Sequence, residues 1–331
     1  PQGAIRETDF VRAETPVPEP DEGEFLVRVT HLSFDPTQRG WMSNDTYVPA
    51  VGLGELMRAK AVGEIVRSRN AAFPVGRLAL GAFGWQDFAV SDGMDDLGPV
   101  TLLAPHVSPE QALGVLGLTG MTAWFGLKAI GRPRPSETVL VTAAAGATGS
   151  IAIQLAKAWG CRTIGVAGGP EKCAWVRDVA GADACLDYRR QNVWRELRTL
   201  APDGVDVIFE NVGGKVLEAG IMSLAQGGRI ALCGTISTYN DDPHTQPGVR
   251  YLLNLCMKRA RIEGFLVFDF VDLFHEAVAG LSALMADGRL TNAIDLQDGF
   301  NAIPSTLIRL FEGRNIGKQL LKLDDPMPPG L

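Results

Sequence analysis

Gly146 and Gly149 have the spacing of a turn that holds phosphate groups between a strand and a helix. They lie in Ala144-Ala145-Gly146-Ala147-Thr148-Gly149, which follows the apolar run at residues 138–141. A glycine at position 146 lets backbone N–H groups approach a pyrophosphate, and a glycine at 149 lets the helix pack close to the strand. The first glycine of the pattern is replaced by Ala144. The segment predicts a dinucleotide site, with an ordinary strand-to-helix connection as the alternative.

The end of the next apolar run indicates which dinucleotide binds. Enzymes that use NAD usually carry an acidic residue there to accept the ribose hydroxyls, whereas a phosphorylated ribose needs cations and no acid. This chain reads Val166-Ala167-Gly168-Gly169-Pro170-Glu171-Lys172. Lys172 is the candidate ligand of the 2′-phosphate, as a flexible point charge. The alternatives are a surface lysine, or Glu171 as the ribose acceptor, but the pattern favours NADPH over NADH.

The elements that position these residues form the second of two predicted domains, since 331 residues exceed one typical core. Within residues 113–287, apolar runs at 138–141, 162–166, 205–209 and 228–232 alternate with helical segments, two of which end near residues 159 and 181. Such alternation predicts an α/β Rossmann domain, a doubly wound parallel sheet with helices on both faces.

The predicted first domain spans residues 1–112 and is rich in β-structure. Short apolar runs, such as 25–29 and 61–66, alternate there with Pro, Gly and Asp. Ser108-Pro109-Glu110-Gln111 predicts the start of a helix near the domain boundary, because it offers an N-cap, a proline and an acid in the first turn. Residues 288–331 return to short runs, and we expect the final strand at 319–323 to rejoin the first domain.

The distribution of Cys and His excludes the zinc site common in two-domain dehydrogenases of this order. The first domain has no cysteine, and its histidines are His31 and His106. All four histidines, including His244 and His275, are expected to pack or hydrogen-bond rather than ligate metal. Without a zinc Lewis acid, hydride addition to an activated alkene is more natural than alcohol oxidation. The five cysteines are interpreted as small buried hydrophobes in a reducing compartment.

The net charge of −7 argues against nucleic acid or an anionic membrane as a partner, because both need a basic face. The short cluster Lys258-Arg259-Ala260-Arg261 is interpreted as a solvated helix end. No apolar run reaches the roughly 20 residues that span a bilayer, and residues 1–7 lack a signal pattern. We therefore expect a cytoplasmic protein.

Four segments carry a family resemblance: Asp35-Pro36 to Met42, Ala144 to Gly149, Cys233-Gly234-Thr235-Ile236-Ser237-Thr238-Tyr239-Asn240, and Gly313-Arg314-Asn315-Ile316-Gly317-Lys318. Over nearly its full length the chain resembles the zinc-free branch of the medium-chain dehydrogenase/reductase superfamily, with its prostaglandin reductases, 2-alkenal double-bond reductases and curcumin reductases. The resemblance implies a GroES-like catalytic domain beside the Rossmann domain, and relatives are often homodimers.

The resemblance also implies the residues of the NADPH site. They are Gly146, Ala147, Thr148, Gly149, Lys172, Tyr188, Asn211, Cys233, Gly234, Thr235, Ile236, Ser237, Tyr239, Phe265, Leu266, Val267 and Asn315. Asn211 and Cys233 follow apolar runs, so a place at the carboxyl edge of the sheet also follows from the pattern. In the family, the tyrosine that matches Tyr239 lies near the substrate carbonyl, where a phenol can stabilise an enolate. The alternative for Tyr239 is a surface-loop residue.

One departure affects the substrate side. The family commonly has Asp-Pro-Tyr-Met-Arg, whereas this chain has Thr37 in place of the tyrosine. Trp41, Tyr47 and Met57 are further candidates for the substrate pocket, although each could equally serve core packing. At Gly54-Glu55-Leu56-Met57 the chain also lacks the Gly-His-Glu of zinc relatives.

The leading hypothesis is reduction of the carbon–carbon double bond of α,β-unsaturated ketones or aldehydes. Hydride from NADPH would reach the β-carbon, and Tyr239 would act on the enolate oxygen. The alternatives are a zinc-free quinone reductase and a non-catalytic protein that binds NADPH.

Overall fold

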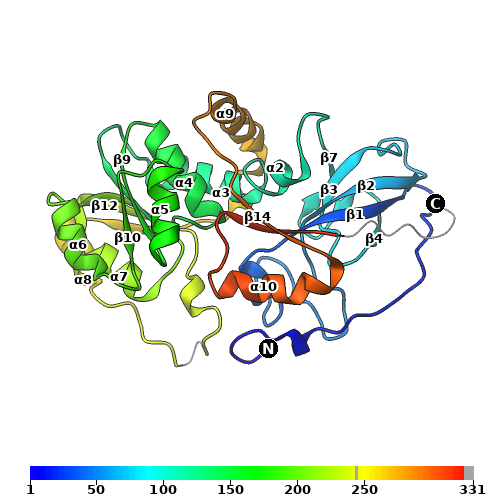
Figure 1. Cartoon of the computed structure of the whole chain (residues 1–331), viewed down its shortest axis with the longest axis horizontal. Helices are drawn as coiled ribbons and strands as arrows, with labels where there is room; N and C mark the ends of the chain where they lie inside the picture. Colours follow the sequence, from blue (N-terminus) through cyan, green and yellow to red (C-terminus); the bar gives the residue numbers. More distant parts are fainter. Residues whose placement is uncertain (243–244, 324–331) are drawn as a thin grey trace. The chain divides into compact units, whose positions relative to one another are not determined.

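A computed structural model describes residues 1–242 and 245–323 and divides them into two compact units. The first unit contains residues 1–113, 294–315 and 319 onward, and the second contains residues 114–293 and 316–318. Figure 1 shows the chain and its helices and strands. No helix of the described residues is both long and apolar enough to cross a membrane.

The second unit is built on a parallel sheet of six strands within the described ranges. In sheet order these strands are β10 (Ala184–Asp187), β9 (Arg162–Ala167), β8 (Thr138–Thr142), β11 (Val205–Glu210), β12 (Leu224–Leu232) and β13 (Arg261–Gly264). Numbered along the chain, this is the order 3-2-1-4-5-6 of the Rossmann fold. The order reverses between β8 and β11, so a ligand is expected at their carboxyl ends.

Helices cover both faces of this sheet. The α-helices are α3 (Leu118–Phe125), α4 (Ala147–Ala158), α5 (Pro170–Asp178), α6 (Val193–Leu200), α7 (Gly214–Met222), α8 (Leu253–Lys258) and α9 (Phe274–Ala286). The unit also contains the π-helix η2 (Gly126–Gly131) and the 3-10 helices η3 (Ile236–Thr238) and η4 (Val267–Leu273). Val139 and Val141 pack into the core with α3, α4 and α9, whereas Leu140 packs into the core with α6 and α7. Alternate side chains of one strand are therefore buried on opposite faces.

The first unit is built on a sheet of seven strands among the described residues. Strand β1 pairs antiparallel with β15, β2 and β4, and β3 pairs antiparallel with β2 and β7. The strands of the unit are β1 (Phe25–Ser33), β2 (Ala61–Ser68), β3 (Leu78–Gly81), β4 (Phe88–Ser91), β5 (Met94–Asp95), β6 (Gly98–Pro99), β7 (Thr101–Leu102), β14 (Ile294–Asp298) and β15 (Lys318–Lys322). Strands β5 and β6 form a separate hairpin. The helices are α1 (Thr37–Trp41), α2 (Pro109–Leu113) and α10 (Ile303–Phe311), with η1 (Glu7–Asp9) and η5 (Phe300–Ala302).

Local signals explain two features of the first unit. Helix α2 begins at Pro109, as predicted, because Ser108 Oγ accepts the N–H of Gln111 at 3.3 Å while Gln111 Oε1 accepts the N–H of Ser108 at 3.0 Å. The final strand β15 pairs with β1, so the end of the described chain lies in this sheet. The two sheets together confirm the predicted fold class.

Candidate functional site

The glycine turn between β8 and α4 is held by a close approach of helix and strand. Gly146 is the N-cap of α4, and its N–H donates to the carbonyl oxygen of Ala143 at 2.8 Å. A β-carbon at Gly149 would overlap that same oxygen, well inside van der Waals contact. Ala143 itself has a left-handed backbone, with φ of 48°. Glycine at 149 is thus a steric requirement of this close approach. The approach places the first N–H groups of α4 at the carboxyl end of β8.

The structure explains why alanine is tolerated at the first position of the motif. Ala144 is fully buried, and its N–H donates to the carbonyl oxygen of Val166 in β9 at 3.0 Å. A β-carbon at Gly165 would lie 2.9 Å from the methyl group of Ala144. Glycine at 165 in β9 therefore leaves the space that the methyl group of Ala144 occupies. The residue without a side chain lies on the neighbouring strand instead of at the first position of the motif.

The segment at residues 316–318 braces the glycine turn from the far end of the sequence. The N–H of Gly317 donates to the carbonyl oxygen of Ala145 at 2.8 Å, and Gly317 forms an isolated parallel bridge with Gly146. Gly317 has φ of 78°, and a β-carbon there would overlap the carbonyl of Ala293. Asn315, two residues earlier, is buried in the first unit. Sequence reasoning reached this segment only through the resemblance.

Tyr188 and Arg189 lie over the end of β9, where the chain lacks an acid. A β-carbon at Gly168 would lie 3.0 Å from both the Tyr188 hydroxyl and Arg189 Nε. The Arg189 guanidinium stands 5.9 Å from the centre of the Tyr188 ring. Lys172 lies in the first turn of α5, three residues after the helix N-cap Gly169. Sequence reasoning named Lys172 and Tyr188 but missed Arg189, which follows Tyr188 directly.

Asp187 organises this corner from the end of β10. Its Oδ1 accepts the N–H of Gly169 at 2.9 Å and that of Arg189 at 3.0 Å. It thereby ties the glycine loop after β9 to the segment that carries Tyr188 and Arg189.

The turn after β11 is held by a buried carboxylate that sequence reasoning did not single out. Glu210 Oε1 accepts the N–H groups of Val212 at 2.6 Å and Gly213 at 2.7 Å. Burial raises the pKa of Glu210 to about 7, against the opposing effect of those hydrogen bonds. Asn211 is fixed beside it, because its Nδ2 donates to the carbonyl of Thr142 at 2.7 Å. The side chain of Asn211 therefore joins the ends of β8 and β11.

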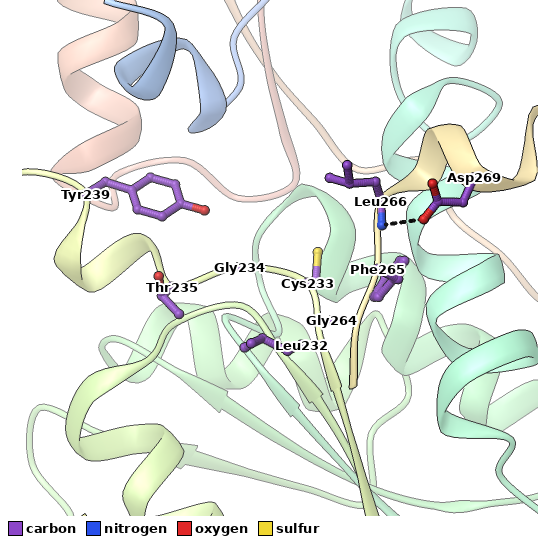
Figure 2. Close-up of a pocket in the computed structure, with 9 residues that line it drawn as sticks. All are labelled: Leu232, Cys233, Gly234, Thr235, Tyr239, Gly264, Phe265, Leu266 and Asp269. Atoms are coloured by element: carbon purple, nitrogen blue, oxygen red, sulfur yellow. Dashed lines mark hydrogen bonds between the residues drawn. The ribbon is translucent and has the colours of Figure 1, made fainter. Parts of the chain in front are cut away.

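Six of the predicted residues line one pocket of about 450 Å³ at the ends of β12 and β13. They are Cys233, Gly234, Thr235, Tyr239, Phe265 and Leu266, and Leu232, Gly264 and Asp269 complete the lining (Figure 2). Of the other predicted residues, Ile236 and Ser237 lie in η3, where Ser237 Oγ donates to the carbonyl of Val212 at 2.6 Å. Val267 is the first residue of η4.

Tyr239 presents its phenol above the end of β12. Figure 2 shows the hydroxyl pointing over Gly234 and Cys233. A β-carbon at Gly234 would lie 3.0 Å from the phenolic oxygen, so glycine leaves room for the ring. Burial raises the pKa of Tyr239 above its ordinary value of 10. The phenol is consequently protonated at neutral pH and can donate a hydrogen bond into the pocket.

The predicted residues of the first unit divide into two groups. Trp41 and Met57 are buried at 3% and 8% exposure, so packing accounts for both. Thr37 and Tyr47 are more exposed, and their hydroxyl oxygens lie 3.0 Å apart. The Tyr47 ring also contacts Trp41 edge to face, with centroids 6.2 Å apart. The threonine that replaces the family tyrosine is therefore paired with a phenol from ten residues later.

Within the described ranges, no group of three or more His, Cys, Asp or Glu side chains is arranged to hold a metal ion. His31 is buried and pairs with Glu110, with 3.5 Å between Nε2 and Oε1, and burial lowers its pKa. His275 Nδ1 lies 3.0 Å from the carbonyl oxygen of Asp272. His244, for which a packing role was predicted, lies outside the described residues.

Comparison with known proteins covers nearly the whole chain. The family described as the N-terminal domain of oxidoreductase matches residues 1–98, and the family named zinc-binding dehydrogenase matches residues 147–286. The NADPH-dependent curcumin reductase of Escherichia coli is 37% identical over 98% of this chain and 94% of that protein. The NADP⁺-dependent 2-alkenal reductase of Nicotiana tabacum is 35% identical over 97% of this chain and 93% of that protein.

A solved structure agrees at the level of the fold. CurA from Vibrio vulnificus in complex with NADPH superposes with a TM-score of 0.92 and 38% identity, and the match covers 98% of this chain and 97% of that one. These findings confirm the predicted family, although one matching family is named for zinc. The chain belongs to the zinc-free branch of the medium-chain dehydrogenase/reductase superfamily, together with curcumin, prostaglandin and 2-alkenal reductases.

Proposed function

We propose that the protein reduces the carbon–carbon double bond of α,β-unsaturated ketones and aldehydes with NADPH. The observation that carries the proposal is a protonated phenol, Tyr239, held above the strand end of a pocket otherwise lined mainly by apolar and small side chains. The relatives named for reduction of curcumin and 2-alkenals support the same chemistry.

The residues around the sheet edge fit NADPH. The backbone at Gly146 and the start of α4 can receive a pyrophosphate, because glycine at 149 lets the helix begin close against the end of β8. The end of β9 carries no acid of its own, and with Lys172, Tyr188 and Arg189 beside it this corner suits a phosphorylated ribose. The pocket at Cys233 to Leu266 can receive the nicotinamide end. Bound NADPH would supply the hydride for the β-carbon of the substrate.

Tyr239 has the role of hydrogen-bond donor to the substrate carbonyl. As negative charge moves onto that oxygen, the bond strengthens, so the phenol lowers the barrier more than it stabilises the ground state. The proton for the α-carbon comes from water or a hydroxyl group. Because the pKa of Tyr239 is raised, the donor persists through neutral and mildly alkaline pH.

Cys233 is suited to a pocket that receives electrophilic alkenes. A thiolate would add to such substrates, and only the thiolate is an effective nucleophile. Burial, together with the charge of Glu210, raises the pKa of Cys233 to about 12. The thiol therefore stays protonated, and we propose that it lines the pocket without reacting.

The first unit would contribute the hydroxyl pair of Thr37 and Tyr47 to the substrate. The Tyr47 phenol is 40% exposed although one side of its ring packs on Trp41. The hydrogen bond with Thr37 orients that phenol. We propose that the pair takes the place of the family tyrosine, whereas the buried Trp41 and Met57 serve packing.

The direct test is NADPH consumption with a panel of enones and 2-alkenals against the corresponding saturated ketones and aldehydes. The proposal predicts turnover only for the unsaturated members, with saturated carbonyl compounds as products. Turnover of the carbonyl group alone would overturn it. Faster reduction of quinones, with oxygen consumption from one-electron products, would favour the quinone reductase, and no turnover with any class would favour a non-catalytic protein.

We further propose that residues 1–112 and 288–331 form the catalytic domain and that residues 113–287 form the cofactor domain. The two compact units support this division in outline, although residues 288–293 and 316–318 belong to the cofactor unit. Separate expression of residues 113–293 would test whether the cofactor unit binds NADPH alone.

A homodimer is proposed from the edge of the parallel sheet. Strand β13 has β12 on one side only among the described strands, and an unpaired edge favours pairing with another chain. Leu252, Leu253 and Met257 are exposed apolar residues on or beside α8. Light scattering after gel filtration is expected to give twice the mass of one chain, and a single-chain mass would contradict the dimer.

We also propose a cytoplasmic location. All five cysteines are free in the structure, which suits a reducing compartment, although Cys256 is exposed rather than buried as the sequence predicted. Cell fractionation tests this assignment.

A further inference from the structure

Asp269 is the charged member of the nine residues that line the pocket. Figure 2 shows it on one side of the pocket and Tyr239 on the other, with Gly234 and Cys233 between them. A β-carbon at Gly264 would meet no atom within 4 Å, so there is open space along the strand that leads to Asp269. A ligand that reaches Tyr239 would therefore lie in the field of this carboxylate.

The negative charge of Asp269 is not balanced locally. Its Oδ2 accepts the N–H of Leu266 at 3.3 Å, and the residue is exposed. No lysine or arginine of the described chain forms an ion pair with it. The neighbouring walls, Phe265 and Leu266, are apolar and supply no counter-charge.

The hydrogen bond to Leu266 shows that Asp269 also caps η4. A cap needs an acceptor oxygen at this position, and asparagine provides one as well as aspartate does. The loop is fixed independently, because Phe265 packs edge to face on Phe209 with centroids 6.5 Å apart. Capping therefore accounts for the acceptor but leaves the charge without a structural role.

We propose that Asp269 determines which charged substrates the pocket accepts: it disfavours enones that carry a carboxylate and favours neutral or cationic ones. The inference rests on the proposed reduction of enones. Like charges a few ångströms apart repel measurably even in a partly solvated site, whereas a neutral substrate is affected little.

The test compares Asp269→Asn with the wild-type protein on three matched enones. The three enones have the same carbon skeleton and differ only in the terminal group, which is a methyl group, a carboxylate or a trimethylammonium group. We expect the kcat/KM of the variant to rise by roughly threefold to tenfold for the carboxylate and to fall by a similar factor for the cation. Relative to the value for the neutral enone, the value for the carboxylate should therefore rise and the value for the cation should fall. Asp272→Asn is the matched control, because it removes one charge from the same η4 turn but not from the pocket lining.

A second readout needs no turnover. In calorimetric titrations, Asp269→Asn should bind the saturated carboxylate product more tightly, and the saturated ammonium product more weakly, than the wild-type protein does. If the neutral enone is still reduced, two results would overturn the role of Asp269. One is an unchanged preference of Asp269→Asn among the three enones, and the other is an equal change of preference in Asp272→Asn. Failure of the wild-type protein to reduce the neutral enone would instead overturn the proposed function.

Discussion

In the unit built on the parallel sheet, the residues proposed to meet the cofactor follow strand ends, whereas the substrate candidates of the other unit lie on α1 and the loop after it. Six predicted residues of the first group line one pocket. Of the four in the second group, two are buried and two share a hydrogen bond. The carboxyl edge of a parallel sheet collects residues by topology, so a pattern predicts their place. Loop residues depend on packing that no short pattern records.

The largest effect should come from the glycine turn, where backbone geometry alone defines the site. Gly149→Ala places a methyl group against the carbonyl of Ala143, so we expect loss of detectable NADPH binding and a loss of stability of about 1–3 kcal/mol or more. Fluorescence titration and thermal unfolding measure both. Gly248→Ala is the control, because a β-carbon there meets nothing within 4 Å. Normal NADPH binding by Gly149→Ala would show that the turn is not the cofactor site.

The next effect concerns a side chain rather than the backbone. Tyr239→Phe removes the donor above Gly234, and we expect kcat for enones to fall by roughly 10²-fold while the Kd for NADPH stays unchanged. Tyr251→Phe removes a more exposed phenol outside the pocket lining and should have no effect. An unaltered kcat for Tyr239→Phe would show that Tyr239 is a loop residue without a role in the reaction.

A third prediction concerns the buried carboxylate behind the pocket. The pKa of Glu210 is raised from 4.5 to about 7, so the folded protein holds a proton that the unfolded chain has released between these values. Its contribution to stability is therefore present at low pH and declines as pH rises from about 5 to about 8, by on the order of 3 kcal/mol. Denaturant unfolding of Glu210→Gln should lack this decline.

The exposed Glu22 supplies the control for this measurement, as Glu22→Gln. Parallel pH profiles for wild type and Glu210→Gln would contradict the raised pKa. Glu210→Gln should retain NADPH binding, because glutamine Oε1 can still accept the N–H groups of Val212 and Gly213.

A fourth prediction tests whether side chains as well as backbone select the cofactor. Arg189→Gln should raise the Kd for NADPH by roughly tenfold and leave that for NADH unchanged, since only NADPH carries the 2′-phosphate. Arg190→Gln is the control at the next residue. Its guanidinium faces Asp187, with 3.9 Å between Nε and Oδ2, so this variant removes a neighbouring charge with a different partner. An equal rise in the Kd for NADPH and the Kd for NADH would mean that Arg189 stabilises the local fold instead of binding the 2′-phosphate.

The smallest effect is expected on the substrate side. Tyr47→Phe should lower kcat/KM for enones by roughly threefold to tenfold without changing the Kd for NADPH. If the hydroxyl pair acts as a unit, Thr37→Val should have a similar effect and the double variant should add little. Additive losses would show that the two hydroxyls act separately.

The long, apolar strands of the parallel sheet could be predicted from the sequence, and two others could not. The runs that became β8, β9, β11 and β12 were recognised, because each is buried on both faces. Strand β10 has only four residues, and β13 begins at Arg261, within a cluster interpreted as a solvated helix end. Helix α8 does end at Lys258, but Arg261 then enters the sheet beside Arg229. Edge strands lack the double burial that makes an apolar run recognisable.

The candidate site shows the same division. Gly146 and Gly149 could be read from their spacing, and Lys172 from the missing acid. Asp269, Arg189 and Glu210 could not, because each is an ordinary charged residue until the fold brings it to a strand end or a pocket wall. The pairing of Thr37 with Tyr47 likewise depends on how α1 and its loop pack.

Isotope transfer tests the site of hydride delivery most directly. NADPH that carries deuterium at the transferred position would be incubated with an enone, and the product examined by NMR. We predict a saturated ketone with deuterium on the former β-carbon, and none at the carbonyl carbon. Deuterium on a carbinol carbon, with the double bond intact, would contradict the account.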